Sequence, residues 1–112
     1  RYTSAMAEIA DVIPPLVPKG YKSAWAQYSI LARNGNHRSL IQAKFEKNGI
    51  PTAIYYPKPL HLQTAFSHLG YREGDFPISE DCAYRILSLP MHPYLKAEEL
   101  RNIARKLRDV SE

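Results

Sequence analysis

A short proline-rich segment holds the densest group of residues that could do chemistry. Between residues 55 and 63 the chain reads Tyr-Tyr-Pro-Lys-Pro-Leu-His-Leu-Gln. The phenols of Tyr55 and Tyr56 and the imidazole of His61 can donate and accept hydrogen bonds, and the ammonium of Lys58 can pair with a phosphate or carboxylate. The prolines reduce the entropy that the segment would lose on binding. The segment is therefore interpreted as a binding loop for a polar ligand, with a proline-pinned structural turn as the alternative.

Other candidate chemistry is weaker. His61 and His68 are seven residues apart and His92 stands alone, so the spacing supports no zinc site. Cys82 is the only cysteine, which excludes an internal disulfide and indicates a reducing cytoplasm. Its place on an apolar helical stripe predicts an inert core thiol. The sequence contains no glycine-rich phosphate-binding motif. No self-sufficient active site can be identified in it.

Length and composition predict one ordinary globular domain. The chain has 112 residues, of which 45% are hydrophobic and 23% charged. Fifteen Lys and Arg against eleven Asp and Glu give a net charge of +4, but these charges are scattered, which argues against nucleic acid as a partner. The apolar stretches are far shorter than the roughly 18 residues of a membrane span, so no membrane association is expected.

Periodicity and turn residues predict the elements that would position the loop. Apolar residues at helical spacing predict a helix over residues 2–12, ended by a proline pair. A two-residue alternation predicts a mostly buried strand over residues 24–31. Asn34 as a cap and Gly49 as a stop predict a second helix of about ten residues.

A β-prone run leads directly into the loop. Residues 52–56 are rich in strand-forming types and are followed by prolines, which predicts a strand that ends there. Because successive strand side chains point to opposite faces, Tyr55 and Tyr56 are not expected to face the core together. One of the two phenols should therefore be offered to the loop side, where Lys58 and His61 also project.

Three elements are predicted beyond the loop. Asp75 as a cap and Pro77 in the first turn predict a helix. Its apolar stripe consists of Ile78, Cys82 and Ile86. A short strand over residues 87–89 follows. A closing helix then lies between Glu98 and Arg108, with an apolar face of Leu100, Ile103, Ala104 and Leu107. The predicted fold class is α/β (α+β), with a small, mostly antiparallel sheet covered by helices.

Four motifs stand in order along the chain. They are Ser-Ala-Trp-Ala-Gln-Tyr-Ser-Ile at 23–30, Gly-Ile-Pro-Thr-Ala-Ile-Tyr-Tyr-Pro-Lys-Pro-Leu-His at 49–61, Gly-Tyr with Gly-Asp-Phe-Pro within 70–77, and Leu-Ser-Leu-Pro-Met-His-Pro at 87–93. Together they resemble the C-terminal part of the DegT/DnrJ/EryC1/StrS family of sugar aminotransferases, which depend on pyridoxal phosphate (PLP). The resemblance covers essentially the whole chain.

The resemblance implies a domain organisation. Residues 21–112 would form the small C-terminal domain of a fold type I PLP transferase, and residues 1–20 would be the end of an interdomain helix and its connector. The large PLP-binding domain would be absent. None of the seven lysines stands in the family's Schiff-base motif, so this chain has no assigned catalytic or cofactor-binding residue and is expected to be inactive alone.

The resemblance also implies an activity. The full enzyme would use PLP to move an amino group from glutamate to a keto sugar linked to a nucleotide. The versions of the motifs look most like the branch that acts on UDP-linked 2-acetamido-3-keto sugars for surface polysaccharide synthesis. A PLP-dependent sugar dehydratase, a regulatory relative and a non-catalytic interaction domain remain alternatives.

The substrate site follows from the same resemblance. Tyr55 and Tyr56 would form hydrogen bonds to the sugar or to the cofactor edge, and Lys58 and His61 would contact the anionic part of the substrate. Many relatives carry His-Tyr-Pro where this chain has Tyr-Tyr-Pro at 55–57, so a role that needs an imidazole at the first position is in doubt here.

The parent enzyme is expected to be a cytoplasmic homodimer. Its large domain or its dimer partner would cover the apolar residues Tyr2, Met6 and Ile9 of the first helix. The isolated chain is therefore expected to associate or to be only marginally stable.

Overall fold

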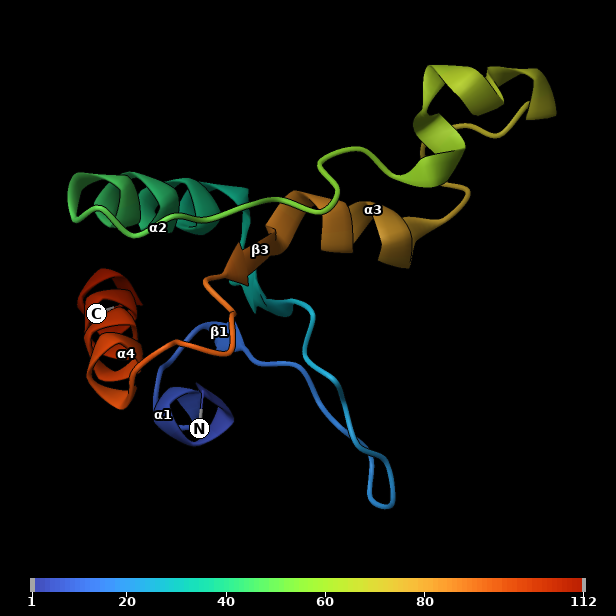
Figure 1. Ribbon diagram of the computed structural model, residues 1–112. Coiled ribbons are helices and arrows are strands. Elements are labelled where there is room, and N and C mark those ends of the chain that lie inside the picture. Colours follow the sequence, from blue (N-terminus) through green and yellow to red (C-terminus); the bar gives the residue numbers. More distant parts are fainter. Residues whose placement is uncertain (1, 112) are drawn as a thin grey trace.

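The computed structural model describes residues 2–111 as helices packed around a small antiparallel sheet (Figure 1). The elements in chain order are α1 (Tyr2–Met6), β1 (Val12–Ile13), β2 (Tyr28–Ala32), α2 (Gly35–Lys47), the 3-10 helices η1 (Leu60–Leu62) and η2 (Thr64–Leu69), α3 (Pro77–Arg85), β3 (Ile86–Leu89) and α4 (Ala97–Ser111). This arrangement confirms the predicted α+β class with a small antiparallel sheet.

The sheet has β2 at its centre. Strand order is β1-β2-β3, with Val12 opposite Ala32 on one side and Tyr28 opposite Leu89 on the other. Alternate residues of β2 are buried, as the sequence predicted, but the strand begins at Tyr28 rather than at residue 24. The shorter strand has a local cause, because Trp25 has a φ of +53°, which is incompatible with extended backbone.

The first helix is shorter than predicted. It ends at Met6, and residues 12–13 form the edge strand β1 instead of a helical turn. Asp11 has a φ of +64°, so the backbone leaves the helical region before β1. Along this helix–turn–strand path Tyr2, Met6 and Ile9, which have helical spacing, still reach one core.

The apolar residues of the N-terminal segment are buried within the chain itself. Tyr2, Met6 and Ile9 are 3%, 1% and 5% exposed. The ring of Tyr2 stacks on that of Tyr28 with 4.7 Å between centroids, and its hydroxyl donates to the carbonyl of Pro90 at 2.7 Å. The expectation that another domain or a partner covers this face was therefore wrong, because α4 and β2 already cover it.

The structure confirms the predicted ends of α2 and the predicted apolar face of α4. The side chain of Asn34 accepts a hydrogen bond from the backbone N–H of His37 at 2.9 Å, and Gly49 follows the helix with a φ of +67°. The predicted apolar face of α4 is buried and consists of Leu100, Ile103, Ala104 and Leu107. Strand β3 lies where a short strand was predicted.

Two predicted elements near the loop differ from the structure. The expected strand over residues 52–56 is reduced to one bridge, in which Ala53 and Ser88 exchange backbone hydrogen bonds at 3.2 and 2.7 Å. Pro51 has no N–H to extend the ladder on one side. After Ala53 the chain forms no further bridge with β3 before it enters the loop.

Helix α3 also differs in its cap and its buried face. Asp75 accepts from the N–H of Arg72 in the preceding turn at 2.7 Å, so it does not cap the helix, which begins after Phe76. Ile78 is 81% exposed and Ile86 already belongs to β3, so the predicted stripe is wrong. The helix packs on the body through the small residue Ala83 instead.

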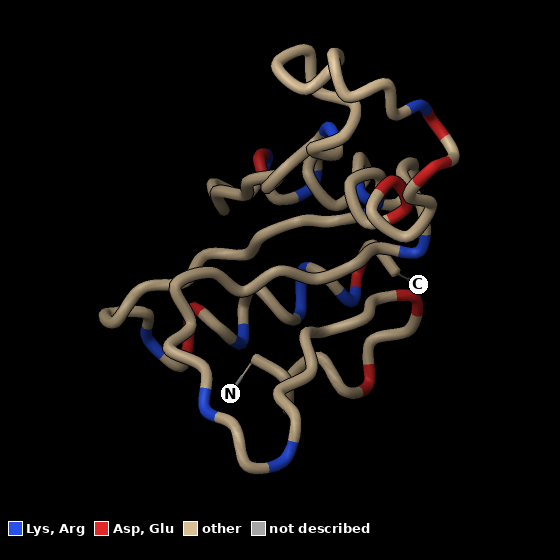
Figure 2. The backbone as a smooth tube through the Cα atoms, turned by 90° about the vertical axis from the view of Figure 1, so that its right-hand side faces the viewer, with Lys and Arg blue, Asp and Glu red and all other residues tan. Residues whose placement is uncertain are grey.

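Residues 57–76, called the arm below, project from the body beside α3 and contain η1 and η2 (Figure 1). Figure 2 shows Lys and Arg interspersed with Asp and Glu along the backbone, whereas the arm has no charged residue between Lys58 and Arg72. Within residues 2–111, no helix has both the length and the apolar character needed to cross a membrane.

Candidate functional site

An open cavity of about 700 Å³ lies where the loop leaves the body beside α3. The structure brings three of the predicted residues, Tyr55, Tyr56 and Lys58, together on its wall. The opposite wall is formed by α3 and the start of β3. Its residues are Ser79, Cys82, Ala83 and Ile86.

Both tyrosines of the loop are accessible. Tyr55 is 43% and Tyr56 69% exposed, and their rings meet edge to face with 5.9 Å between centroids. The peptide bond between them is cis. One phenol was expected on the loop side, and the structure places both tyrosines at the same cavity because no regular strand continues through them.

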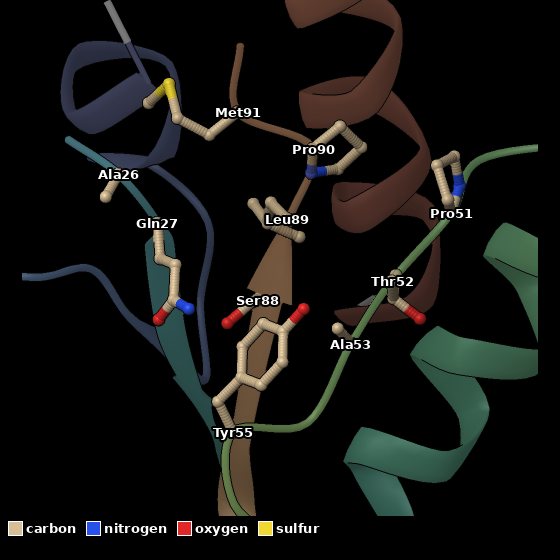
Figure 3. Close-up of a pocket in the computed structure, with 10 residues that line it drawn as sticks. All are labelled: Ala26, Gln27, Pro51, Thr52, Ala53, Tyr55, Ser88, Leu89, Pro90 and Met91. Carbon is tan, nitrogen blue, oxygen red and sulfur yellow. The ribbon is translucent and has the colours of Figure 1, made fainter.

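Tyr55 also borders a second, smaller cavity of about 230 Å³ (Figure 3). Gln27, Thr52 and Ser88 contribute its polar groups, and Figure 3 shows the ring of Tyr55 lying beside Ser88 of β3. The hydroxyl of Ser88 is 2.7 Å from that of Ser29 on β2. Tyr55 therefore borders both the larger cavity and the smaller one, in which the buried Ser88 lies.

His61 does not line either of these cavities. Its Nε2 lies 2.8 Å from a carboxylate oxygen of Glu80, its ring packs against Phe76, and its side chain is 7% exposed. The imidazole therefore faces α3 rather than the ligand space.

Glu80 is the main residue near the site that the sequence analysis missed. Burial raises the pKa of its carboxyl, but hydrogen bonds from His61 and from the N–H groups of Gly74 and Phe76 outweigh that effect and hold the pKa below its usual value. Its position in the first turn of α3 was a weak signal, because acids are common there. Its pairing with a histidine 19 residues away left no local pattern.

Cys82 and Gln63 also line the larger cavity, although the sequence analysis named neither of them as a substrate-binding residue. Cys82 was predicted to be a core residue, but it is half-buried and lines the larger cavity. Gln63 lines the same cavity and donates to the carbonyl of Lys58 at 3.3 Å, which closes the loop around its prolines. Among residues 2–111, no group of three His, Cys, Asp or Glu side chains is arranged to hold a metal ion.

The donors on the larger cavity suit an oxygen-rich ligand. Two phenols, an ammonium, a primary amide and the Ser79 hydroxyl can all donate hydrogen bonds, and Lys58 adds a positive charge. Pro59, Leu60 and Ile86 supply apolar surface beside them. Such a wall can bind hydroxyl, carbonyl and phosphate oxygens of a ligand while packing against its apolar parts.

Comparison with known proteins gives a consistent family match. Residues 1–108 match the model of the DegT/DnrJ/EryC1/StrS aminotransferase family. A pleiotropic regulatory protein of Geobacillus stearothermophilus is 41% identical over 108 residues, which are 95% of this chain and 28% of that protein. The UDP-N-acetyl-3-dehydro-alpha-D-glucosamine 3-aminotransferase of Acidithiobacillus ferrooxidans is 37% identical over 98 residues, 88% of this chain and 25% of that protein.

The fold matches as well as the sequence. The crystal structure of a DegT DnrJ EryC1 StrS aminotransferase from Brucella abortus superimposes with a TM-score of 0.86 at 45% identity. The match covers 99% of this chain and 28% of that one. The chain thus spans little more than a quarter of the length of the relatives it matches.

Proposed function

Because the chain belongs to the DegT/DnrJ/EryC1/StrS aminotransferase family, we propose that it forms the small C-terminal domain of a sugar aminotransferase and supplies part of the substrate site. The full protein moves an amino group from glutamate to the keto group of a nucleotide-linked sugar. The observation that carries this proposal is the cavity wall on which Tyr55, Tyr56 and Lys58 stand together.

Each residue of that wall has a proposed role. The hydroxyls of Tyr55 and Tyr56 form hydrogen bonds with the sugar, and the ammonium of Lys58 pairs with a phosphate of the nucleotide. Gln63 adds a neutral donor at the same wall, and Ser79 adds one from the opposite wall. His61, which faces Glu80, contributes by holding the arm rather than by touching the ligand.

The cofactor is proposed to bind mainly outside these residues. Solved members of the family include PLP-bound forms. The larger cavity is lined by no carboxylate within the described part of the chain, so the cavity offers no acid to pair with the pyridine nitrogen of PLP. This donor set fits the sugar nucleotide better than the cofactor ring.

The proposed substrate is a UDP-linked 2-acetamido-3-keto sugar used for surface polysaccharide synthesis. Two observations support this class: the versions of the motifs at residues 23–30 and 49–61, and the name of the Acidithiobacillus relative, a UDP-sugar 3-aminotransferase. A homodimer in the cytoplasm, with residues 1–20 joining the C-terminal domain at 21–112 to the large domain, remains part of the same proposal.

The second candidate is a relative without transaminase activity. The name of the Geobacillus relative, a pleiotropic regulatory protein, favours keeping this alternative. A dehydratase or a non-catalytic interaction domain would use the same fold. The candidates differ at the Schiff-base lysine, which is proposed to lie outside this chain.

The test combines sequence and assay. The genomic sequence preceding this chain should encode a lysine in the family's Schiff-base motif, and replacement of that lysine would favour the second candidate. The longer protein, supplied with PLP, glutamate and a UDP-2-acetamido-3-keto sugar, should form 2-oxoglutarate, with a dTDP-4-keto sugar as the control substrate. The 112-residue chain under the same conditions should form none, and turnover by it would contradict the proposed location of the catalytic lysine.

A further inference from the structure

We propose that Glu80 is a positioning residue that holds both ends of the arm against α3 and thereby sets the shape of the larger cavity. Its effect on the substrate rests on the proposed function. Its effect on the arm rests on the geometry alone.

The carboxylate of Glu80 contacts the arm at two points far apart in the sequence. Oε1 lies 2.8 Å from Nε2 of His61, in η1 near the start of the arm. The backbone N–H of Gly74, in the turn that ends the arm, donates to Oε1 at 2.9 Å and to Oε2 at 3.0 Å. One side chain therefore closes the base of the arm.

The arm has few buried contacts that could fix its orientation. Each of its residues, 57–76, lies in the described part of the chain, and none is buried as a whole residue, although the side chain of His61 is only 7% exposed. Its internal packing includes aromatic contacts of Phe76 with His61 and Tyr71, with centroids 4.8 and 5.1 Å apart. Without a buried apolar core, the orientation of the arm depends strongly on its polar attachment.

The helix that carries Glu80 is itself fixed to the body. Arg85, at the end of α3, donates to the carbonyl of Ala32 on β2 at 3.0 Å. Arg38 of α2 donates to the carbonyl of Ala83 at 2.8 Å. Glu80 thus links the arm to a helix that is anchored on two neighbouring elements.

The attachment by Glu80 determines the shape of the larger cavity, because one wall of that cavity lies on α3 and the other lies on the arm. Ser79 and Cys82, on either side of Glu80 along α3, line one wall. Lys58, Leu60 and Gln63, at the start of the arm, line the other. Release of the arm would move these walls apart and separate Lys58 from the ligand groups bound by the tyrosines.

The charge state of Glu80 agrees with this role. The pKa of its carboxyl is held below the usual value, so the carboxylate is ionised near neutral pH. Hydrogen bonds to an ionised acceptor are stronger than neutral ones. The ionised carboxylate is therefore available to hold the arm near neutral pH.

The first measurement follows the arm without any ligand. In the 112-residue chain, ¹H–¹⁵N spectra and hydrogen exchange report on the amide of Gly74. Glu80→Ala should shift this cross-peak and accelerate its exchange, and Glu80→Gln, which keeps one acceptor oxygen, should have a smaller effect. Asp81→Asn is the matched control, since it removes a neighbouring carboxylate on the same helix that contacts Arg85 and not the arm.

The second measurement follows binding in the longer protein, with UDP-N-acetylglucosamine as the probe. Glu80→Ala should raise the Kd for UDP-N-acetylglucosamine about tenfold or more, as expected for loss of a contact that organises a charged ligand site. Glu80→Gln should restore part of the affinity, and Asp81→Asn should leave it unchanged. If Glu80→Ala does not fold, the Glu80→Gln variant is compared with Asp81→Asn in both measurements.

The two measurements separate the possible failures. An unchanged Gly74 amide in the Glu80 variants overturns the proposal outright. A changed amide with wild-type Kd, while Tyr56→Phe weakens binding, overturns the role of Glu80 in the site. If Tyr56→Phe also binds normally, the proposed substrate site fails and the positioning role fails with it.

Discussion

The imidazole of His37, in the first turn of α2, meets the hydroxyl of Ser111, in the last turn of α4, with 3.3 Å between Nε2 and Oγ. The other ring nitrogen, Nδ1, accepts a hydrogen bond from the backbone N–H of Arg33 at 3.2 Å. Because Nδ1 is an acceptor, the ring proton is assigned to Nε2. His37 is 1% exposed and links the start of α2 to the end of α4 as a neutral group.

This link predicts a dependence of stability on pH. Burial lowers the pKa of His37, the cation of Arg33 lowers it further, and Asp11 opposes the shift. Below the ordinary value of 6.5, the unfolded chain takes up a proton that the folded chain resists. The stabilising contribution of the neutral ring is therefore complete above that pH and is lost as the pH falls toward the lower folded pKa.

Urea unfolding between about pH 7.5 and about pH 5 tests this dependence. The free energy of unfolding of the wild-type chain should fall more steeply on acidification than that of His37→Gln, whose side chain does not titrate. Parallel curves for the two proteins would show that His37 is not the group responsible.

Substitutions in the loop test the proposed substrate contacts. Tyr55→Phe and Tyr56→Phe each remove only a hydroxyl. A hydrogen bond from that hydroxyl to a charged ligand group contributes about 1.5 to 3 kcal/mol. Each variant should therefore lower kcat/KM for the sugar nucleotide about 10- to 100-fold. His61→Ala should lower kcat/KM by releasing the arm. Tyr94→Phe is the matched control, because Tyr94 is 85% exposed and lines neither cavity.

The kinetic measurement belongs in the complete enzyme, with the thermal midpoint of each variant checked alongside. Wild-type specificity constants in Tyr55→Phe, Tyr56→Phe and His61→Ala would mean that the loop is only a structural turn.

The glycine after α2 should be sensitive to substitution for reasons of backbone conformation alone. Gly49 has a φ of +67°, and a Cβ added there would meet no atom within 4 Å. Gly49→Ala should therefore lower the free energy of unfolding by about 1 kcal/mol through the left-handed conformation and not through a clash. Gly49→Asn should cost less, since Asn tolerates this region. Equal losses in the two variants, measured by urea unfolding, would contradict the explanation.

The closing helix should contribute strongly to stability. Leu107 is 0% exposed in the core that α4 shares with α1 and α2, so Leu107→Ala should cost about 2 to 5 kcal/mol. Leu40→Ala makes the same change on α2 where the side chain is 60% exposed, and it should stay within about 0.5 kcal/mol of wild type. Thermal unfolding of the two variants under one condition compares them directly. A loss at Leu107 no larger than that at Leu40 would show that α4 is not docked as described.

Features that depend on neighbouring residues could be predicted from the amino-acid sequence alone. The cap at Asn34 and the stop at Gly49 bound α2 because each acts through its own backbone and the adjacent turn. The apolar face of α4 was visible as a helical period, and β3 as a short β-prone run between a helix and a proline. Tyr55, Tyr56 and Lys58 could be grouped as candidates because they are nearly adjacent in the chain.

Features that depend on residues far apart in the chain are set by the packing of the folded protein. Tyr2 is buried because two distant residues contact it: the carbonyl of Pro90, 88 positions away, accepts a hydrogen bond from its hydroxyl, and Tyr28 stacks on its ring. His61 faces Glu80 because η1 and α3 meet at the base of the arm, which no local pattern encodes. The run before the loop became a single bridge for the same reason: backbone pairing is set by the strand that lies opposite, and β3 offers this run only Ser88.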